Sequence, residues 1–136
     1  MSIAKLALVF VCLLSVPLEP KEVPKEAQTT PLFSKDLTDF PGKEGLMITV
    51  EYPPGAADPI HRHNAHAFVY VLEGTIVMQV KGGKEVTLAP GQTFYEAPND
   101  IHTVGRNASN TTPAKFVVFL VKEKGAPVLT RQDSAP

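Results

Sequence analysis

Apolar and polar residues alternate along several short stretches of the chain. In residues 46–52, Leu46, Ile48, Val50 and Tyr52 alternate with more polar neighbours. Successive side chains of an extended strand point to opposite faces, so this stretch predicts a strand that is buried on one face. Comparable short runs follow at 68–72, 75–80, 85–88, 93–96, 101–104 and 115–121.

Glycine and proline separate these runs. Pro53-Pro54-Gly55 follows the first run, and Lys81-Gly82-Gly83-Lys84 joins two later ones. Two adjacent glycines suit the positive φ angles of a tight hairpin turn. Amphipathic helical periodicity is hard to find after the N-terminus, so the pattern predicts an all-β sandwich or barrel.

The N-terminal segment has the pattern of an export signal. Lys5 precedes the almost wholly apolar residues 6–14, a run of secretory length that is too short to span a bilayer comfortably. We therefore predict a signal peptide over 1–18 and an exported protein, periplasmic or secreted. The alternative is a short uncleaved anchor, which would be the chain's one contact with a membrane.

The rest of the chain divides into three parts. Residues 19–31 are rich in proline and charge and predict an extended linker. Residues 32–124 are predicted to form a single domain, whose first part, around Phe33 and Phe40, can fold back over a sheet as an arm. Residues 125–136 are expected to be a loose tail. The formal net charge of −1 gives no reason to expect a nucleic-acid partner.

The histidines are confined to two places. Three of the four lie within six positions, at His61, His63 and His66, and the fourth is His102. Because alternate side chains of a strand share a face, His61 and His63 point the same way. Two imidazoles on one face and a third from a later strand form a site for a divalent first-row metal ion.

These residues resemble the two sequence motifs of the cupin superfamily, in particular small single-domain cupins of the quercetinase-like type. The matching positions are Gly55, His61, His63 and Gly74 for the first motif and Gly91, Pro98, His102 and Asn107 for the second. The resemblance covers about residues 46–121. It implies a double-stranded β-helix, or jelly-roll barrel, with a metal ion in the barrel mouth held by His61, His63 and His102.

The chain departs from the cupin pattern at the position of the usual glutamate ligand, where it has Ala67. His66 is one replacement: strict alternation points it away from the other histidines, but a bulge at Asn64-Ala65 would reverse its direction. Glu96, at the end of a strand before the turn to His102, is a second candidate replacement. A third alternative is a site made of three histidines and solvent. We predict His66 as a ligand or a close neighbour of the metal.

The ligand types indicate the chemistry. Imidazoles suit iron, nickel, copper and zinc, and manganese less ideally. The resemblance implies a metal-dependent oxidoreductase of the dioxygenase type that acts on a small molecule. A binding module without turnover and a non-redox isomerase or cyclase are the alternatives. Glu96 and Tyr95 are the candidate catalytic residues, although Tyr95 is expected to pack with a hydroxyl partner if it has no catalytic role.

A homodimer is also expected. The strand at 46–52 and the arm around Phe33 and Phe40 offer apolar edges that a monomer would leave partly exposed. Small cupins similar to this chain are often dimers.

Overall fold

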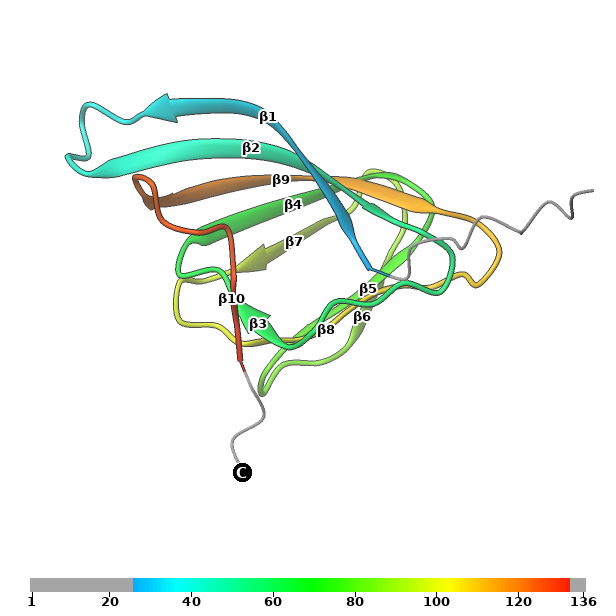
Figure 1. The fold of residues 1–136 in the computed structure, drawn as a ribbon. Coiled ribbons are helices and arrows are strands. Elements are labelled where there is room, and N and C mark those ends of the chain that lie inside the picture. The colour runs from blue at the N-terminus through cyan, green and yellow to red at the C-terminus, as the bar shows by residue number, and fades with distance from the viewer. Residues whose placement is uncertain (1–25, 133–136) are drawn as a thin grey trace, which may run out of the picture.

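The computed structural model describes residues 26–132, and these form ten β-strands. The strands are β1 (Gln28–Asp36), β2 (Lys43–Tyr52), β3 (His61–Arg62), β4 (His66–Glu73), β5 (Ile76–Val80), β6 (Val86–Leu88), β7 (Thr93–Glu96), β8 (His102–Asn107), β9 (Ala114–Glu123) and β10 (Thr130–Arg131). Two antiparallel five-stranded sheets, ordered β1-β2-β9-β4-β7 and β10-β3-β8-β5-β6, face each other as the halves of a barrel (Figure 1). This confirms the all-β jelly-roll fold. Among the described residues, no helix has the length and hydropathy needed to cross a bilayer.

Alternating side chains build the core between the two sheets. On β2, Ile48, Val50 and Tyr52 are buried, as the pattern predicted. The same alternation on β4 buries Ala67, Val69 and Val71, and on β9 it buries Phe116, Val118 and Leu120. Burial of each larger apolar side chain contributes about 1.5–3 kcal/mol, so register is fixed wherever a strand has one buried face.

Strand β1 begins inside the segment that was predicted as a linker. It pairs only with β2, and its register shifts between Pro31 and Phe33. An edge strand with a bulge tolerates proline because the missing N–H is not needed by a second neighbour. The proline content therefore misplaced the start of the folded region. The predicted signal segment 1–18 and the linker up to residue 25 lie outside the described residues.

The C-terminal segment also joins the fold, although it was predicted as a loose tail. Strand β10 pairs with β3, with Arg131 opposite His61, and the amide of Gln132 donates to the carbonyl of Ile60 at 2.9 Å. The buried Lys122 ammonium donates to the Ala126 carbonyl at 2.6 Å and to Glu44. These bonds hold the chain against the barrel as it leaves β9.

Gly74 provides a test of the packing between the turn after β4 and the start of β9. Its φ is +69°, and a Cβ atom there would lie 2.5 Å from the Pro113 carbonyl oxygen. Gly82 also has a positive φ, +82°, but nothing lies within 4 Å of its Cβ position. We expect Gly74→Ala to lower the free energy of unfolding by about 2–4 kcal/mol and Gly82→Ala by about 1–2 kcal/mol, measured by urea denaturation. Equal losses in the two variants would contradict this packing.

Candidate metal centre

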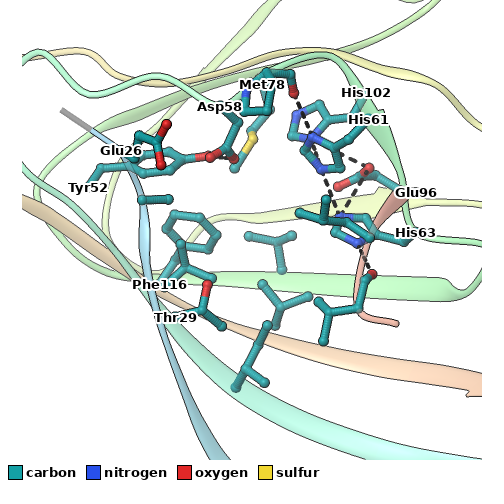
Figure 2. Close-up of a pocket in the computed structure, with 18 of the residues that line it drawn as sticks. Glu26, Thr29, Tyr52, Asp58, His61, His63, Met78, Glu96, His102 and Phe116 are labelled. Atoms are coloured by element: carbon teal, nitrogen blue, oxygen red, sulfur yellow. Dashed lines mark hydrogen bonds and ion pairs between the residues drawn. The ribbon is translucent and has the colours of Figure 1, made fainter. Parts of the chain in front are cut away.

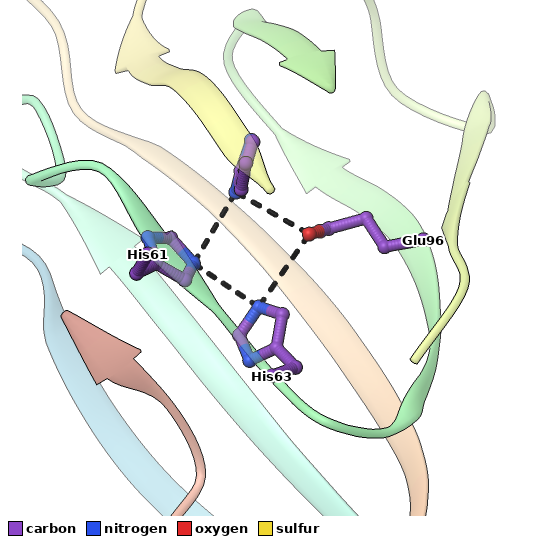
Figure 3. A group of neighbouring side chains, drawn as sticks. His61, His63 and Glu96 are labelled. Carbon is purple, nitrogen blue, oxygen red and sulfur yellow. Dashed lines mark hydrogen bonds and ion pairs between the residues drawn. The ribbon is translucent and has the colours of Figure 1, made fainter. Parts of the chain in front are cut away.

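Four side chains converge at one end of the barrel (Figure 3). His61 lies on β3 and His63 just after it, Glu96 ends β7, and His102 begins β8. The Nε2 atom of His61 lies 3.2 Å from Nε2 of His63 and 3.3 Å from Nδ1 of His102. The Oε2 atom of Glu96 lies 3.6 Å from Nδ1 of His102 and 3.8 Å from Nε2 of His63.

Strand pairing brings these residues together from distant parts of the sequence. His61 is the direct partner of His102 in the β3–β8 pair, and Glu96 is the partner of Ala67 in the β4–β7 pair. His61 and His63 share a face, as their spacing predicted, and both face the cluster.

Backbone carbonyl groups orient two of the imidazoles. Nδ1 of His61 lies 2.8 Å from the Pro59 carbonyl oxygen, and Nδ1 of His63 lies 2.7 Å from that of Val128. A carbonyl can only accept, so each Nδ1 donates its hydrogen and each Nε2 presents a lone pair to the cluster. Metal-binding histidines commonly have such a partner on the second nitrogen. Val128 belongs to the C-terminal segment, and sequence reasoning gave it no role.

The four residues fit a single metal ion. Neighbouring ligand atoms around an ion with bonds of about 2.1 Å are separated by about 3.0–3.4 Å. The neighbouring distances here are 3.2–3.8 Å, and all four ligand atoms lie within 4.8 Å of one another, so small side-chain movements would close the site around an ion. Glu96 Oε2 is buried and has no hydrogen-bond partner among the described residues. An unpartnered buried carboxylate is costly, and a cation removes that cost. Three imidazoles and one carboxylate suit a divalent first-row ion.

Burial sets the protonation of these groups when no cation is bound. It raises the pKa of Glu96 to about 7, with further contributions from Asp100 and Asp58. It lowers the pKa of His63 to about 4 and that of His102 to about 3, where the neighbouring His61 adds to the shift. The two imidazoles are therefore neutral at physiological pH and ready to bind a metal, whereas Glu96 must often lose a proton first.

His66 lies on the outside of the barrel. Its side chain is exposed and its Nδ1 is 2.7 Å from the hydroxyl of Tyr95, whose side chain is 46% exposed on the same outer face. The buried positions 61, 65, 67, 69 and 71 continue one alternation through the turn at Asn64, so no bulge reverses the direction of His66. The structure therefore does not bring His66 or Tyr95, both predicted as site residues, to the cluster.

Glu96 lies directly across the β4–β7 pair from Ala67. Directly paired residues of neighbouring antiparallel strands have Cβ atoms about 4.5–5.5 Å apart, so a side chain on β7 reaches the place of one on β4. Ala67 is fully buried and only methyl-sized, and Glu96 points into the cluster from across the pair. A carboxylate therefore faces the cluster from position 96, whereas the cupin pattern has one at position 67.

A cavity of about 140 Å³ adjoins the cluster, and all four candidate ligands line it (Figure 2). Most of its other walls are apolar, formed by Ile48, Val50, Val69, Met78, Phe116, Val118, Val128 and Leu129. Five further polar or charged residues, Glu26, Thr29, Tyr52, Asp58 and Arg131, also contribute. Sequence reasoning missed Tyr52 and Asp58 because their proximity depends on the fold of residues 53–57.

Comparison with solved structures supports the double-stranded β-helix. An uncharacterised conserved protein with a double-stranded β-helix domain from Klebsiella pneumoniae subsp. pneumoniae MGH 78578 has a TM-score of 0.62 and 15% identity over 82% of this chain and 90% of that one. Recombinant oxalate oxidase in complex with glycolate has a TM-score of 0.60 and 23% identity over 80% of this chain. The DMSP lyase DddQ from Ruegeria pomeroyi DSS-3 has a TM-score of 0.56 and 20% identity over 64% of this chain.

The chain spans only 56% of the oxalate oxidase and 42% of the DMSP lyase, and at these identities the similarity shows the fold alone. Comparison with curated proteins gives no sequence match. The family profile of the cupin domain, however, matches residues 48–120, more than half of the chain. The protein therefore belongs to the cupin family.

Proposed function

We propose that the protein binds one divalent transition-metal ion through His61, His63, Glu96 and His102 and acts on a small molecule in the adjoining cavity. The observation that carries this proposal is the buried Oε2 atom of Glu96, which has no hydrogen-bond partner among residues 26–132 and lies within 3.8 Å of two imidazole nitrogens. Iron, manganese, nickel, copper and zinc all accept this ligand set.

The protein's own groups prepare the site. The carbonyls of Pro59 and Val128 hold two imidazoles in the tautomer that binds a metal. Glu96 adds a negative charge, and the apolar cavity walls limit access of water, which strengthens electrostatic interactions with a bound molecule. A bound ion would supply Lewis-acid chemistry and, for the redox-active metals, electron transfer.

Within this function, we favour an oxidoreductase of the dioxygenase type. Proteins with this fold include an oxalate oxidase, which catalyses a redox reaction, and a DMSP lyase, which catalyses a non-redox one, so the fold is compatible with both alternatives. Zinc has no redox chemistry, so a zinc-loaded protein can catalyse the non-redox reaction but not the redox one. We expect the iron- or manganese-loaded protein to take up oxygen when it is tested with oxalate and hydroxybenzoates. The zinc-loaded protein should take up none. Product formation with zinc would favour a lyase, isomerase or cyclase, and binding without product would favour a binding module.

Two further properties belong to the proposal. The protein is exported, on the evidence of residues 1–18, and N-terminal sequencing of protein recovered from outside the cytoplasm tests this.

The protein forms a homodimer through the outer face of the β4–β7 pair, where Phe68, Tyr70, Leu72 and Tyr95 are 41–49% exposed. Light scattering at micromolar concentration should give twice the monomer mass, and a monomer would contradict the dimer.

Substitution of Glu96 tests the ligand set. We expect Glu96→Ala to weaken zinc binding by about 10- to 100-fold, because a ligand is lost, and His66→Ala, the matched control on the outer face, to leave it unchanged. Adding Ala67→Glu to Glu96→Ala should restore much of the affinity, since the two positions are cross-strand partners. Isothermal titration gives all four affinities. A large effect of His66→Ala together with none of Glu96→Ala would reverse the assignment.

The pH dependence of metal affinity tests the role of Glu96 separately. Because the pKa of Glu96 is about 7, a metal ion must displace a proton from this carboxyl group below pH 7. Metal affinity should therefore fall about tenfold per pH unit between pH 7 and 5. Above pH 7 it should level off. His63 and His102, with pKa values of about 4 and 3, stay neutral in this range. Metal titrations of the wild type and Glu96→Gln check this, and an identical pH profile in both would contradict it.

A further inference from the structure

We propose that Tyr52 and Asp58 form a ligand subsite beside the metal centre, which accepts a hydrogen bond from a hydroxyl or amino group of a single-ring-sized ligand. This inference rests on the proposed function, because the metal ion would hold the other end of the ligand. It assigns a role to a buried polar pair that the metal site does not use.

The pair is held rigidly. Tyr52 is fully buried, its ring packs edge-on against Phe116 at 5.1 Å between centroids, and its hydroxyl donates to Oδ2 of Asp58. The backbone amide of Asp58 donates to the Gly105 carbonyl at 2.8 Å. A carboxylate fixed through both its side chain and its backbone has a defined direction, as a binding group needs.

The pair lies next to a candidate metal ligand. From the position that a Cβ atom would take on Gly105, the Tyr52 hydroxyl is 2.9 Å away, Asp58 Oδ2 3.2 Å and His102 Cε1 2.9 Å. A Cβ atom there would force the Tyr52 hydroxyl or the His102 ring to shift and would press on Asp58, so glycine leaves the space that this arrangement needs. Figure 2 shows Tyr52 and Asp58 lining the same cavity as the histidines and Glu96. One ligand in this cavity can therefore contact the metal centre and Asp58 together.

Hydrogen-bonding capacity and charge define the group that the pair would bind. Asp58 accepts the Tyr52 hydroxyl on Oδ2, and its Oδ1 atom accepts no hydrogen bond from any residue in 26–132. The charged residues of the cavity wall other than histidine are the acids Glu26, Asp58 and Glu96 and the single base Arg131. A second carboxylate on the ligand would meet repulsion there, whereas a hydroxyl or amino group can donate to Asp58.

The volume of the cavity limits the size of the ligand. A cavity of about 150 Å³ encloses one benzene molecule, and this one has about 140 Å³. The apolar walls suit the faces of one ring. A ligand with three rings would extend out of the cavity. The geometry therefore favours a compact ligand with a metal-binding oxygen at one end and a hydrogen-bond donor at the other.

Ligand pairs that differ only in the donor test this directly. The probes are 3- and 4-hydroxybenzoate and the corresponding fluorobenzoates, which are similar in size but lack the O–H donor, titrated into zinc-loaded protein. We expect at least one hydroxy compound to bind about tenfold more tightly than its fluoro partner, as for a hydrogen bond to a charged group. Asp58→Asn should reduce this preference to threefold or less without changing the affinity for zinc or for the fluoro compounds.

The outcomes separate the subsite from the metal site. If zinc binds but neither hydroxy compound is preferred, or if the preference survives Asp58→Asn, the pair only supports the loop and the subsite is overturned while the metal proposal stands. If wild-type protein does not bind zinc, the proposed function fails and the subsite fails with it. Because the wild-type comparison needs no substitution, the absence of any preference there overturns the subsite even if Asp58→Asn does not fold.

Discussion

The placement of an uncompensated carboxyl group among neutral imidazoles is the constraint on which this end of the barrel depends. Glu96 is 3% exposed and its pKa is raised to about 7 from 4.5, so ionising it in the metal-free protein costs roughly 3 kcal/mol more than in water. His63 and His102 resist protonation for the same reason, burial. A divalent cation would compensate the charge of Glu96, and the neutral imidazoles could bind it without first losing a proton. Ionising Glu96 without a cation is unfavourable, and the imidazoles are uncharged. One bound ion would therefore use all four groups as ligands.

The strand framework determines which residues join that set. Position 67 faces inward and position 66 outward by one unbroken alternation, so His66 ends beside Tyr95 on the outer face, away from the cluster. The inward position carries only a methyl group, and the residue paired with it on β7 supplies the carboxylate. The C-terminal segment completes the arrangement, because its Val128 carbonyl orients His63 and β10 covers the edge of β3. The barrel mouth thus combines contributions from four separate parts of the chain.

The sequence predicted those features that depend on local pattern. Alternation identified the buried face of β2, and the spacing of His61 and His63 identified two groups that share a face. The replacement for the missing glutamate depended on which residue lies opposite Ala67. That residue is 29 positions away, and its identity follows from the register between β4 and β7, which local pattern does not reveal. The proline-rich composition of residues 19–31 and the polar C-terminus were typical of unstructured chain, yet residues 28–31 pair with β2 and residues 130–131 pair with β3. Tyr52 and Asp58 likewise meet only after the loop between them has folded.

Anomalous X-ray diffraction from crystals of the manganese- or zinc-loaded protein, recorded at the metal absorption edge, tests the central claim most directly. One ion bound by His61, His63, Glu96 and His102 predicts a single strong peak within about 2.0–2.3 Å of one atom from each of the four side chains. A peak beside His66, or an ion held by the three histidines with the Glu96 carboxylate turned away, would contradict the claim that Glu96 takes the place of the missing ligand.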